Sequence, residues 1–230
     1  MGVVIIPARG GSKRIPRKNI RLFHGKPIIS YAIQCAKESQ LFDRIIVSTD
    51  DQEIASVAQK FGAEVPFVRS TKNADDFATT SDVLLEVLGQ LQTTHELPEW
   101  ACCLYPTTPL LIHTDLRNAR ETFLESNADV LLAATRFDFP IQRAFELDSE
   151  KLVHLREPEA IAMRSQDLTP TYHDAGAFYF FNCRGLMERK SLWAGKVAAF
   201  TLPSDRVQDI DTLSDWRLAE YKYQQLHPND

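Results

Sequence analysis

Residues 3–19 have the sequence VVIIPARGGSKRIPRKN, and the change of pattern inside this stretch indicates the architecture of the chain. Residues 3–6 are an unbroken run of β-branched side chains, which predicts a fully buried central strand. Residues 7–19 are rich in Gly, Pro and basic side chains, which is typical of a loop. Open α/β folds bind ligands at the carboxyl ends of their strands, so this loop is the first candidate binding site.

Beyond this stretch, short apolar runs alternate with amphipathic segments. Residues 27–38 have apolar side chains at helical spacing, with Pro27 expected as the first helical residue. Asp50-Asp51 precede another helical pattern that ends at Gly62, and we expect them to cap it. Further helices are expected at 81–91, 115–125 and 213–225, and strands at 45–49, 64–68, 101–105, 130–134, 177–181 and 197–202. These repeated β-then-α units predict an α/β fold, with a mostly parallel mixed sheet and helices on both faces.

The chain length of 230 residues fits one such domain, expected over residues 1–230. Residues 138–172 interrupt the alternation, and within them the segment 147–152 predicts a hairpin. Hydrophobic residues make up 44% and charged residues 25% of the chain, which excludes a disordered or collagen-like protein. No apolar run approaches the roughly 18 residues of a membrane span. We expect a cytoplasmic protein that does not bind membranes, and its four scattered cysteines predict buried thiols rather than a disulfide scaffold.

The charges are unevenly distributed along the chain. Residues 1–37 contain eight Lys or Arg and no Asp or Glu, so all 31 acidic residues follow them, and the net charge is −5. A local cationic patch on an acidic protein suits a small polyanionic ligand better than a long nucleic acid. Nucleic-acid binding is therefore not expected.

The basic loop itself is suited to a triphosphate. Backbone N–H groups at Gly10 and Gly11 can contact phosphate oxygens, while Arg9, Lys13 and Lys18 neutralise their charge. The loop has neither the G-x-x-x-x-G-K-[ST] nor the G-x-G-x-x-G spacing. A solvated basic turn is the alternative interpretation, and the position of the loop after a buried strand favours a ligand site.

A second candidate site is Asp209-Ile210-Asp211, near the other end of the chain. Two carboxylates separated by one residue lie on the same side of an extended backbone, where they can share a Mg²⁺ ion that also contacts nucleotide phosphates. The alternative is that Asp211 only caps a helix beginning near Leu213. A lone D-x-D is a weak signal, so the metal hypothesis depends on the cationic loop as its partner.

Four motifs together resemble the CMP-sialic acid synthetases, the acylneuraminate cytidylyltransferase family. They are IPARGGSKRIPRKNI at 6–20, FDRIIVSTDD at 42–51, PTTP at 106–109 and QDIDT at 208–212, and they span nearly the whole chain in the family's order. The resemblance implies a three-layer nucleotidyltransferase fold and transfer of CMP from CTP to the anomeric hydroxyl of a nonulosonic acid, with release of pyrophosphate. It also implies Mg²⁺ as cofactor and a homodimer, in which residues 138–172 reach the partner and help to close the sugar pocket.

Within the family, the segments 164–168 and 172–179 are most similar to the enzymes that use pseudaminic acid. Enzymes for sialic acid usually carry Gln where this chain has Tyr105 and Asn where it has Ala175. Both departures lie near the expected sugar. The alternatives are N-acetylneuraminic acid, legionaminic acid or Kdo as the sugar. From another class, a GT-A type glycosyltransferase also uses a D-x-D site, but that motif usually follows an internal strand.

The resemblance also assigns roles to individual residues. It implies Lys18, Asp209 and Asp211 as catalytic, with the two aspartates as metal ligands, and it leaves the general base open between an aspartate and a metal-bound hydroxide. Residues implied to bind the nucleotide are Ala8, Arg9, Gly10, Gly11, Ser12, Lys13, Asn19, Arg69, Ala78 and Thr80. Residues implied to bind the sugar are Tyr105, Arg164, Gln166, Tyr172, His173, Asp174 and Tyr179. A structural ion pair is the alternative role for Arg164.

Overall fold

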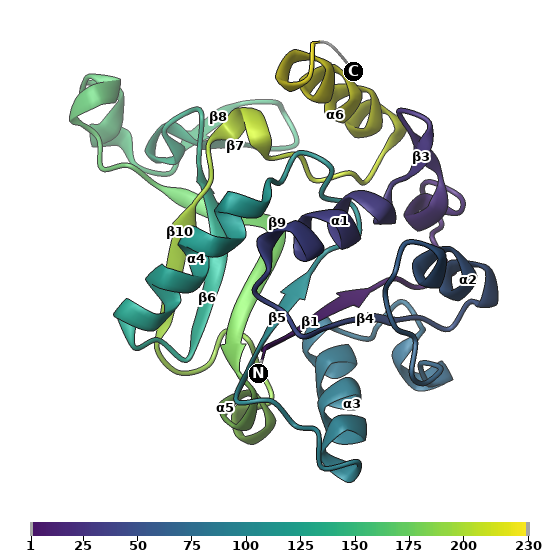
Figure 1. Cartoon of the computed structure of the whole chain (residues 1–230). Coiled ribbons are helices and arrows are strands. Elements are labelled where there is room, and N and C mark those ends of the chain that lie inside the picture. The colour runs from purple at the N-terminus through teal and green to yellow at the C-terminus, as the bar shows by residue number, and fades with distance from the viewer. Residues whose placement is uncertain (1, 229–230) are drawn as a thin grey trace.

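A six-stranded sheet with the order β10-β6-β9-β5-β1-β4 runs through the molecule (Figure 1). The computed structural model describes residues 2–228, so residues 1, 229 and 230 of the expected domain lie outside it. The strands are β1 (Gly2–Pro7), β4 (Arg44–Ser48), β5 (Trp100–Leu104), β6 (Val130–Arg136), β9 (Tyr172–Asn182) and β10 (Val197–Thr201). Only β9 runs antiparallel to its neighbours in this sheet. The expected mostly parallel mixed sheet is confirmed.

Helices cover both faces of the sheet, also as expected. Because side chains of a strand alternate between faces, Val4 and Ile6 of β1 pack with one set of helices and Val3 and Ile5 with the other. The first set is α1 (Ile29–Ser39), α2 (Gln52–Lys60) and α4 (His113–Ser126); the second is α3 (Thr80–Thr93) and α5 (Cys183–Arg189). All these core side chains of β1 are buried, which explains its unbroken β-branched sequence.

A third apolar cluster connects the basic loop to the C-terminal helix α6 (Leu213–Leu226). It contains Ile15 of the loop, Phe23, Ile210 and Trp216, all buried. The rings of Phe23 and Trp216 meet edge to face, with centroids 5.6 Å apart. This cluster brings the segment around Ile210 beside a loop that precedes it by almost 200 residues.

Side-chain caps define where the helices begin. Asp51 caps α2 as expected, and Thr79 caps α3. The cap of α6 is Thr212, whose hydroxyl oxygen accepts from the N–H of Asp215 while the Asp215 carboxylate accepts from the N–H of Thr212. Asp211 therefore does not cap this helix, and the alternative interpretation of that residue is wrong.

Three sequence-based expectations about secondary structure are corrected. Residues 64–68 form no strand but a single bridge from Glu64 to Ile46, because Pro66 has no N–H to continue a ladder. Pro27 does not begin a helix: β2 (Leu22–Phe23) and β3 (Lys26–Pro27) form a tight hairpin whose two turn residues have positive φ. The last buried strand, β9, begins at residue 172 rather than 177, and the helix α5 that follows it was not expected.

Residues 137–171 leave the sheet between β6 and β9 and project away from it (Figure 1). The expected hairpin is present as β7 (Phe145–Leu147) and β8 (Val153–Leu155), and three short 3₁₀ helices accompany it, Ile141–Arg143, Pro158–Ile161 and Ser165–Asp167. Many large apolar side chains are exposed here: Phe139, Ile141, Phe145, Leu147, Leu152, Val153, Leu155, Ile161 and Met163. Over residues 2–228, the structure contains no helix long and apolar enough to cross a membrane.

Candidate active site

A cleft of about 260 Å³ opens at the carboxyl ends of β1 and β5. Successive strands of the chain lie on opposite sides of β1, β4 on one side and β5 on the other, so this is a topological switch point of the sheet. Residues of three separate segments and one C-terminal aspartate line the cleft, among them Arg9, Ser12, Lys13, Arg14, Lys18, Asn19, Arg69, Asp75, Asp76, Ala78, Thr80, Tyr105 and Asp211. The fold thus collects most of the residues predicted for the nucleotide in one place.

Two cations of the loop are paired with a single carboxylate across the cleft. Arg9 Nη1 donates to Asp76 Oδ1 at 2.9 Å and to the carbonyl oxygen of Asp75 at 2.8 Å. The ammonium of Lys13 donates to the other carboxylate oxygen of Asp76. These contacts, first the hydrogen bond from Lys13, lower the pKa of Asp76. Asp76 thus pairs with two of the cations that were predicted to bind phosphate.

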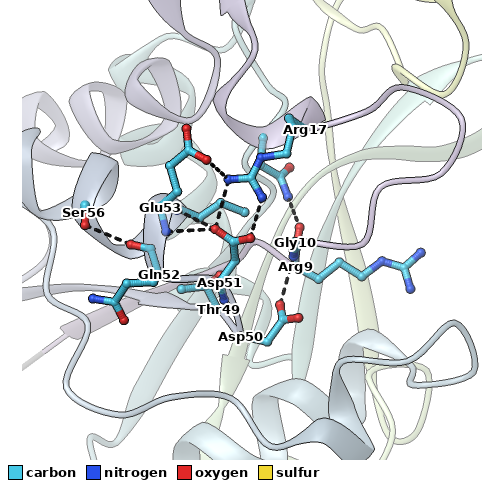
Figure 2. Close-up of polar contacts among 11 residues, drawn as sticks. Arg9, Gly10, Arg17, Thr49, Asp50, Asp51, Gln52, Glu53 and Ser56 are labelled. Atoms are coloured by element: carbon cyan, nitrogen blue, oxygen red, sulfur yellow. Dashed lines mark hydrogen bonds and ion pairs between the residues drawn. The ribbon is translucent and has the colours of Figure 1, made fainter.

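Side chains that follow β4 hold the backbone of the loop (Figure 2). Asp50 Oδ1 accepts the N–H of Gly10 at 2.9 Å, and the guanidinium of Arg17 contacts Asp51 and Glu53. Figure 2 shows the Arg9 side chain pointing away from this acidic cluster. Ala8 is buried in the core, and neither it nor the two glycines of the loop are among the residues that line the cleft.

Small and buried polar groups form the other end of the cleft. Arg69 is 5% exposed, and its guanidinium donates to Ser48, with Nε 3.0 Å from the hydroxyl oxygen. Burial lowers the pKa of Arg69. The side chain of Asn19, also buried, donates to the carbonyl oxygen of Arg9 at 2.9 Å. Arg69, Asn19 and the small side chain of Ala78 all line the cleft.

The D-x-D segment reaches the cleft through its second aspartate. Asp211 lines the cleft, and its Oδ1 lies 2.7 Å from Arg14 Nη2 and 3.6 Å from Lys18 Nζ. Lys18 Nζ also donates to the carbonyl oxygen of Ile210 at 2.5 Å. Asp209 does not line the cleft and much of its surface is exposed, yet partial desolvation and the charge of Asp211 raise its pKa.

This arrangement fits a hard divalent cation that takes part of its ligands from a substrate. The electrostatic repulsion between Asp209 and Asp211 is the kind that Mg²⁺ relieves, and carboxylates are the ligands it prefers. Within residues 2–228 there is no group of three His, Cys, Asp or Glu side chains able to hold a metal. Mg²⁺ is commonly bound by one or two carboxylates together with substrate phosphates, so two neighbouring aspartates, one of them paired with the basic loop, fit its requirements.

A chain of hydroxyl groups leads from the cleft into β9. Tyr105 Oη lies 2.8 Å from Thr80 Oγ1, and the ring of Tyr105 packs edge-on against Tyr179, with centroids 6.0 Å apart. The Tyr179 hydroxyl donates to Asp174, whose other oxygen accepts the N–H of Gly176 at 2.8 Å. Burial raises the pKa of Tyr105 to about 12 and raises that of Tyr179 as well, so both remain neutral hydrogen-bond donors.

The remaining residues predicted for the sugar lie outside the cleft. Arg164 and Gln166 are exposed on the projecting segment, and Tyr172 and His173 are exposed at the beginning of β9. The His173 ring packs against Phe137, with centroids 4.7 Å apart. One chain therefore brings together most of the residues predicted for the nucleotide and Tyr105, but not the outer residues predicted for the sugar.

Sequence reasoning missed four polar residues of this region. Arg14 belongs to the basic loop, so its charge was a signal that could have identified it. Asp75 and Asp76 stand directly before Phe77 and are exposed, and no local pattern distinguishes them from other surface acids. Arg17 was the fourth, because its partners Asp51 and Glu53 follow β4, far along the chain.

Comparison with known proteins agrees with this geometry. The family model described as "Cytidylyltransferase" matches residues 3–217. The chain is 45% identical over 223 residues to a pseudaminic acid cytidylyltransferase of Campylobacter jejuni, covering 97% of this chain and 96% of that protein. It is 32% identical over 225 residues to a CMP-N,N'-diacetyllegionaminic acid synthase of Legionella pneumophila, covering 95% and 94%.

Among solved structures, the fold is similar to a CMP:2-keto-3-deoxy-manno-octonic acid synthetase complexed with CTP. The TM-score is 0.72 at 18% sequence identity, and the match covers 98% of this chain and 99% of that one. A 4-diphosphocytidyl-2C-methyl-D-erythritol synthase of Anaerococcus prevotii gives a TM-score of 0.66 at 13% identity, covering 97% and 98%. The three-layer nucleotidyltransferase fold is thereby confirmed.

Proposed function

The chain belongs to the cytidylyltransferase family, and from this premise we propose that it transfers CMP from CTP to the anomeric hydroxyl of pseudaminic acid and releases pyrophosphate. The observation that carries the proposal is the cleft at the switch point, which combines a cationic loop, a carboxylate and a pocket lined by small residues. The 45% identity to pseudaminic acid enzymes over nearly the whole chain supports the choice of sugar.

In this proposal the triphosphate lies along the basic loop. Arg9, Ser12, Lys13 and Lys18 contact its oxygens, and their positive charges replace the hydration of the phosphates. Cytosine lies toward Arg69, Ala78 and Thr80, where the pocket is lined by small side chains and a buried guanidinium. Ala8, Gly10, Gly11 and Asn19 shape the backbone around the nucleotide rather than adding charge.

The reaction is an in-line displacement at the α-phosphorus. The anomeric oxygen of the sugar forms the new P–O bond while the bond to the pyrophosphate oxygen breaks, and the hydroxyl proton leaves to a base or to water. Lys18 is held against the Ile210 carbonyl oxygen at 2.5 Å, so its charge is already oriented toward the phosphates when CTP binds. Positioning and charge stabilisation are the chain's contribution to the rate.

We include Mg²⁺ in this proposal, held by Asp209 and Asp211. When bound, it neutralises charge on the phosphate oxygens. Arg14 and Lys18, which neutralise Asp211 in the free protein, are then available to contact phosphate.

A homodimer is the proposed active form. The exposed apolar side chains of residues 137–172 support it, because a monomeric protein rarely leaves so many together in solvent. Arg164, Gln166, Tyr172 and His173 lie on or beside this segment, so dimerisation could place them at the partner's cleft, where Tyr105, Asp174 and Tyr179 form the inner wall. We also propose a cytoplasmic location, supported by four buried free thiols.

The test is pyrophosphate release from CTP and Mg²⁺ with pseudaminic, legionaminic and N-acetylneuraminic acids compared side by side. We expect release with pseudaminic acid at a kcat/KM at least tenfold above the others. Preference for legionaminic acid would keep the reaction but change the sugar, and the Legionella relative makes that the second candidate. Absence of release with these sugars and with Kdo would overturn the proposal.

A further inference from the structure

The basic loop is attached at both ends to the acidic pair that follows β4 (Figure 2). At one end Asp50 Oδ1 accepts the N–H of Gly10 at 2.9 Å. At the other end the Arg17 guanidinium donates to both oxygens of Asp51, with one N···O distance of 3.1 Å. Between the two anchors lie loop residues that line the cleft, Ser12, Lys13, Arg14 and Ile15. We call Asp50, Asp51 and Arg17 the loop clamp.

Asp51 gives the clamp a rigid support. Its Oδ1 accepts the N–H groups of Glu53 and Ile54 at 2.9 and 3.0 Å, in the first turn of α2. A carboxylate is favoured at this positive end of a helix, and the hydrogen bond from Arg17 lowers its pKa further. The loop is therefore attached to a helix rather than to another loop.

The backbone of Arg17 is in an uncommon conformation. Its φ is 57°, in the left-handed region that side chains other than glycine rarely adopt. Arg17 directly precedes Lys18 and Asn19, so this turn sets the direction in which the chain presents both residues to the cleft. Its contacts with Asp51 and Glu53 offset the cost of the turn.

The other end of the clamp is close-packed. A Cβ atom at Gly10 would lie 2.7 Å from Asp51 Oδ2 and 2.9 Å from Asp51 Cβ, so the loop backbone rests directly on this side chain. At Gly11 a Cβ atom would meet nothing within 4 Å. Arg17 itself does not line the cleft, so any effect it has on the nucleotide acts through the loop.

We propose that Arg17 is a positioning residue, which holds residues 10–17 through Asp51 so that Ser12, Lys13 and Lys18 face the triphosphate before CTP arrives. This inference rests on the proposed use of CTP. Arg17 contacts none of the reacting atoms, so its loss weakens nucleotide binding and leaves the KM for the sugar unchanged. If Arg17 only stabilised the fold as a whole, its loss would change both nucleotide binding and the KM for the sugar.

The experiment compares the wild type with Arg17→Gln, Asp51→Asn and the double variant. Asn at position 51 retains an oxygen that can cap α2, so only the ion pair is removed. The measurements are the Kd for CTP in Mg²⁺ by calorimetry, the KM for pseudaminic acid, and amide hydrogen exchange of residues 10–17 without nucleotide. Each single change should raise the Kd for CTP about tenfold and speed exchange, as expected for a charge-assisted bidentate pair at a partly exposed site. Both changes break the same ion pair, so the Kd of the double variant for CTP should be no higher than that of the single variant with the higher Kd.

Arg44 provides a matched control at the opposite end of β4. It also pairs with two carboxylates, Glu64 at 2.7 Å and Glu96 at 3.0 Å, and Arg44→Gln should leave CTP binding unchanged. The proposed clamp is overturned if Arg17→Gln binds CTP with a Kd within twofold of the wild type and its amide hydrogen exchange is unchanged. It is also overturned if Arg44→Gln weakens CTP binding as much as Arg17→Gln does. A third refuting result is a double variant in which the two single losses of CTP affinity add. Lack of pyrophosphate release by the wild type would overturn the proposed function, whereas the exchange measurement judges the clamp separately.

Discussion

Replacing Asp76 with Asn should make the enzyme bind CTP more tightly. The Asp76 carboxylate contacts Arg9 and Lys13, two cations that line the cleft. A triphosphate bound by these cations must displace Asp76 first. The segment keeps its shape without this charge, because the neighbouring Asp75 Oδ1 accepts the N–H groups of Phe77 and Ala78 at 2.9 and 2.8 Å.

The size of the effect follows from the exposure of the two ion pairs. The side chains are 38% exposed at Arg9, 77% at Lys13 and 40% at Asp76, so solvent screens both pairs. Exposed pairs of this kind change an equilibrium constant by a factor of about 1.4 to 5 each. Because Lys13 is the most exposed, its pair belongs at the lower end, and we expect the KM for CTP to fall about three- to fivefold.

The assay is pyrophosphate release at saturating sugar and Mg²⁺ with CTP varied, at low salt and at about 0.5 M salt, where screening should shrink the difference. The kcat should stay unchanged. Glu125→Gln on α4 removes the same charge from an exposed position outside the cleft, and it should leave the KM unchanged. A KM that rises in Asp76→Asn would show that the carboxylate helps to bind CTP, and the reasoning would then be wrong.

Asp211→Asn should lower kcat/KM at least about 100-fold by removing a proposed metal ligand, with circular dichroism and melting temperature unchanged. Gly10→Ala should destabilise the protein by about 1–3 kcal/mol in urea unfolding because its Cβ meets a carboxylate, whereas Gly11→Ala should stay within about 0.5 kcal/mol. The pKa of Asp209 is raised in the folded state, so the folded protein binds this proton more tightly than the unfolded chain does. The free energy of unfolding therefore falls as the pH rises from the ordinary Asp pKa through the raised one. Metal-free Asp209→Asn should therefore unfold at higher urea than the wild type at pH 7, and the difference should vanish near pH 3. Phe145→Ser, on the exposed hairpin, should raise the dimer dissociation constant at least about tenfold in light scattering while leaving the monomer fold intact.

The parts of the fold that the sequence predicted well are those whose pattern is local. The β-branched run of β1 and the capped apolar stripe of α2 each contain their own boundary signals, so their positions were confirmed within a few residues. The errors occurred where a partner or a turn decides the structure. Residues 64–68 have strand-like apolar character, but β4 is an edge strand and Pro66 stops the ladder after one bridge.

The beginning of β9 was missed for a related reason. Its register against β6 shifts between Leu132 and Ala134, and Gly176 within it has a positive φ of 60°. A bulge of this kind breaks the alternation by which a strand is detected in a sequence. In this irregular stretch one Asp174 oxygen accepts from the Tyr179 hydroxyl and the other from the N–H of Gly176, so the departure from the regular pattern lies beside the site.

The site shows the same division between local and distant information. The cations cluster within residues 9–18 and were evident from composition alone. The carboxylates that hold them lie far away in the sequence, as with Asp76, which is 67 residues from Arg9. Only the folded sheet brings them together, because β1, β4 and β5 end at the same edge.

Each basic residue between positions 9 and 18 has a carboxylate partner, and three of these partners should behave differently when a nucleotide binds. Asp51 holds Arg17 and caps a helix, so it stays in place and keeps the loop in position. Asp76 holds Arg9 and Lys13, which the proposed function assigns to the phosphates, so in that proposal it must withdraw. Asp211 holds Arg14 and Lys18 and could exchange them for Mg²⁺, releasing both cations to the substrate. Carboxylates thus neutralise a strongly basic loop on an acidic protein, at the places that the proposed function assigns to phosphates and Mg²⁺.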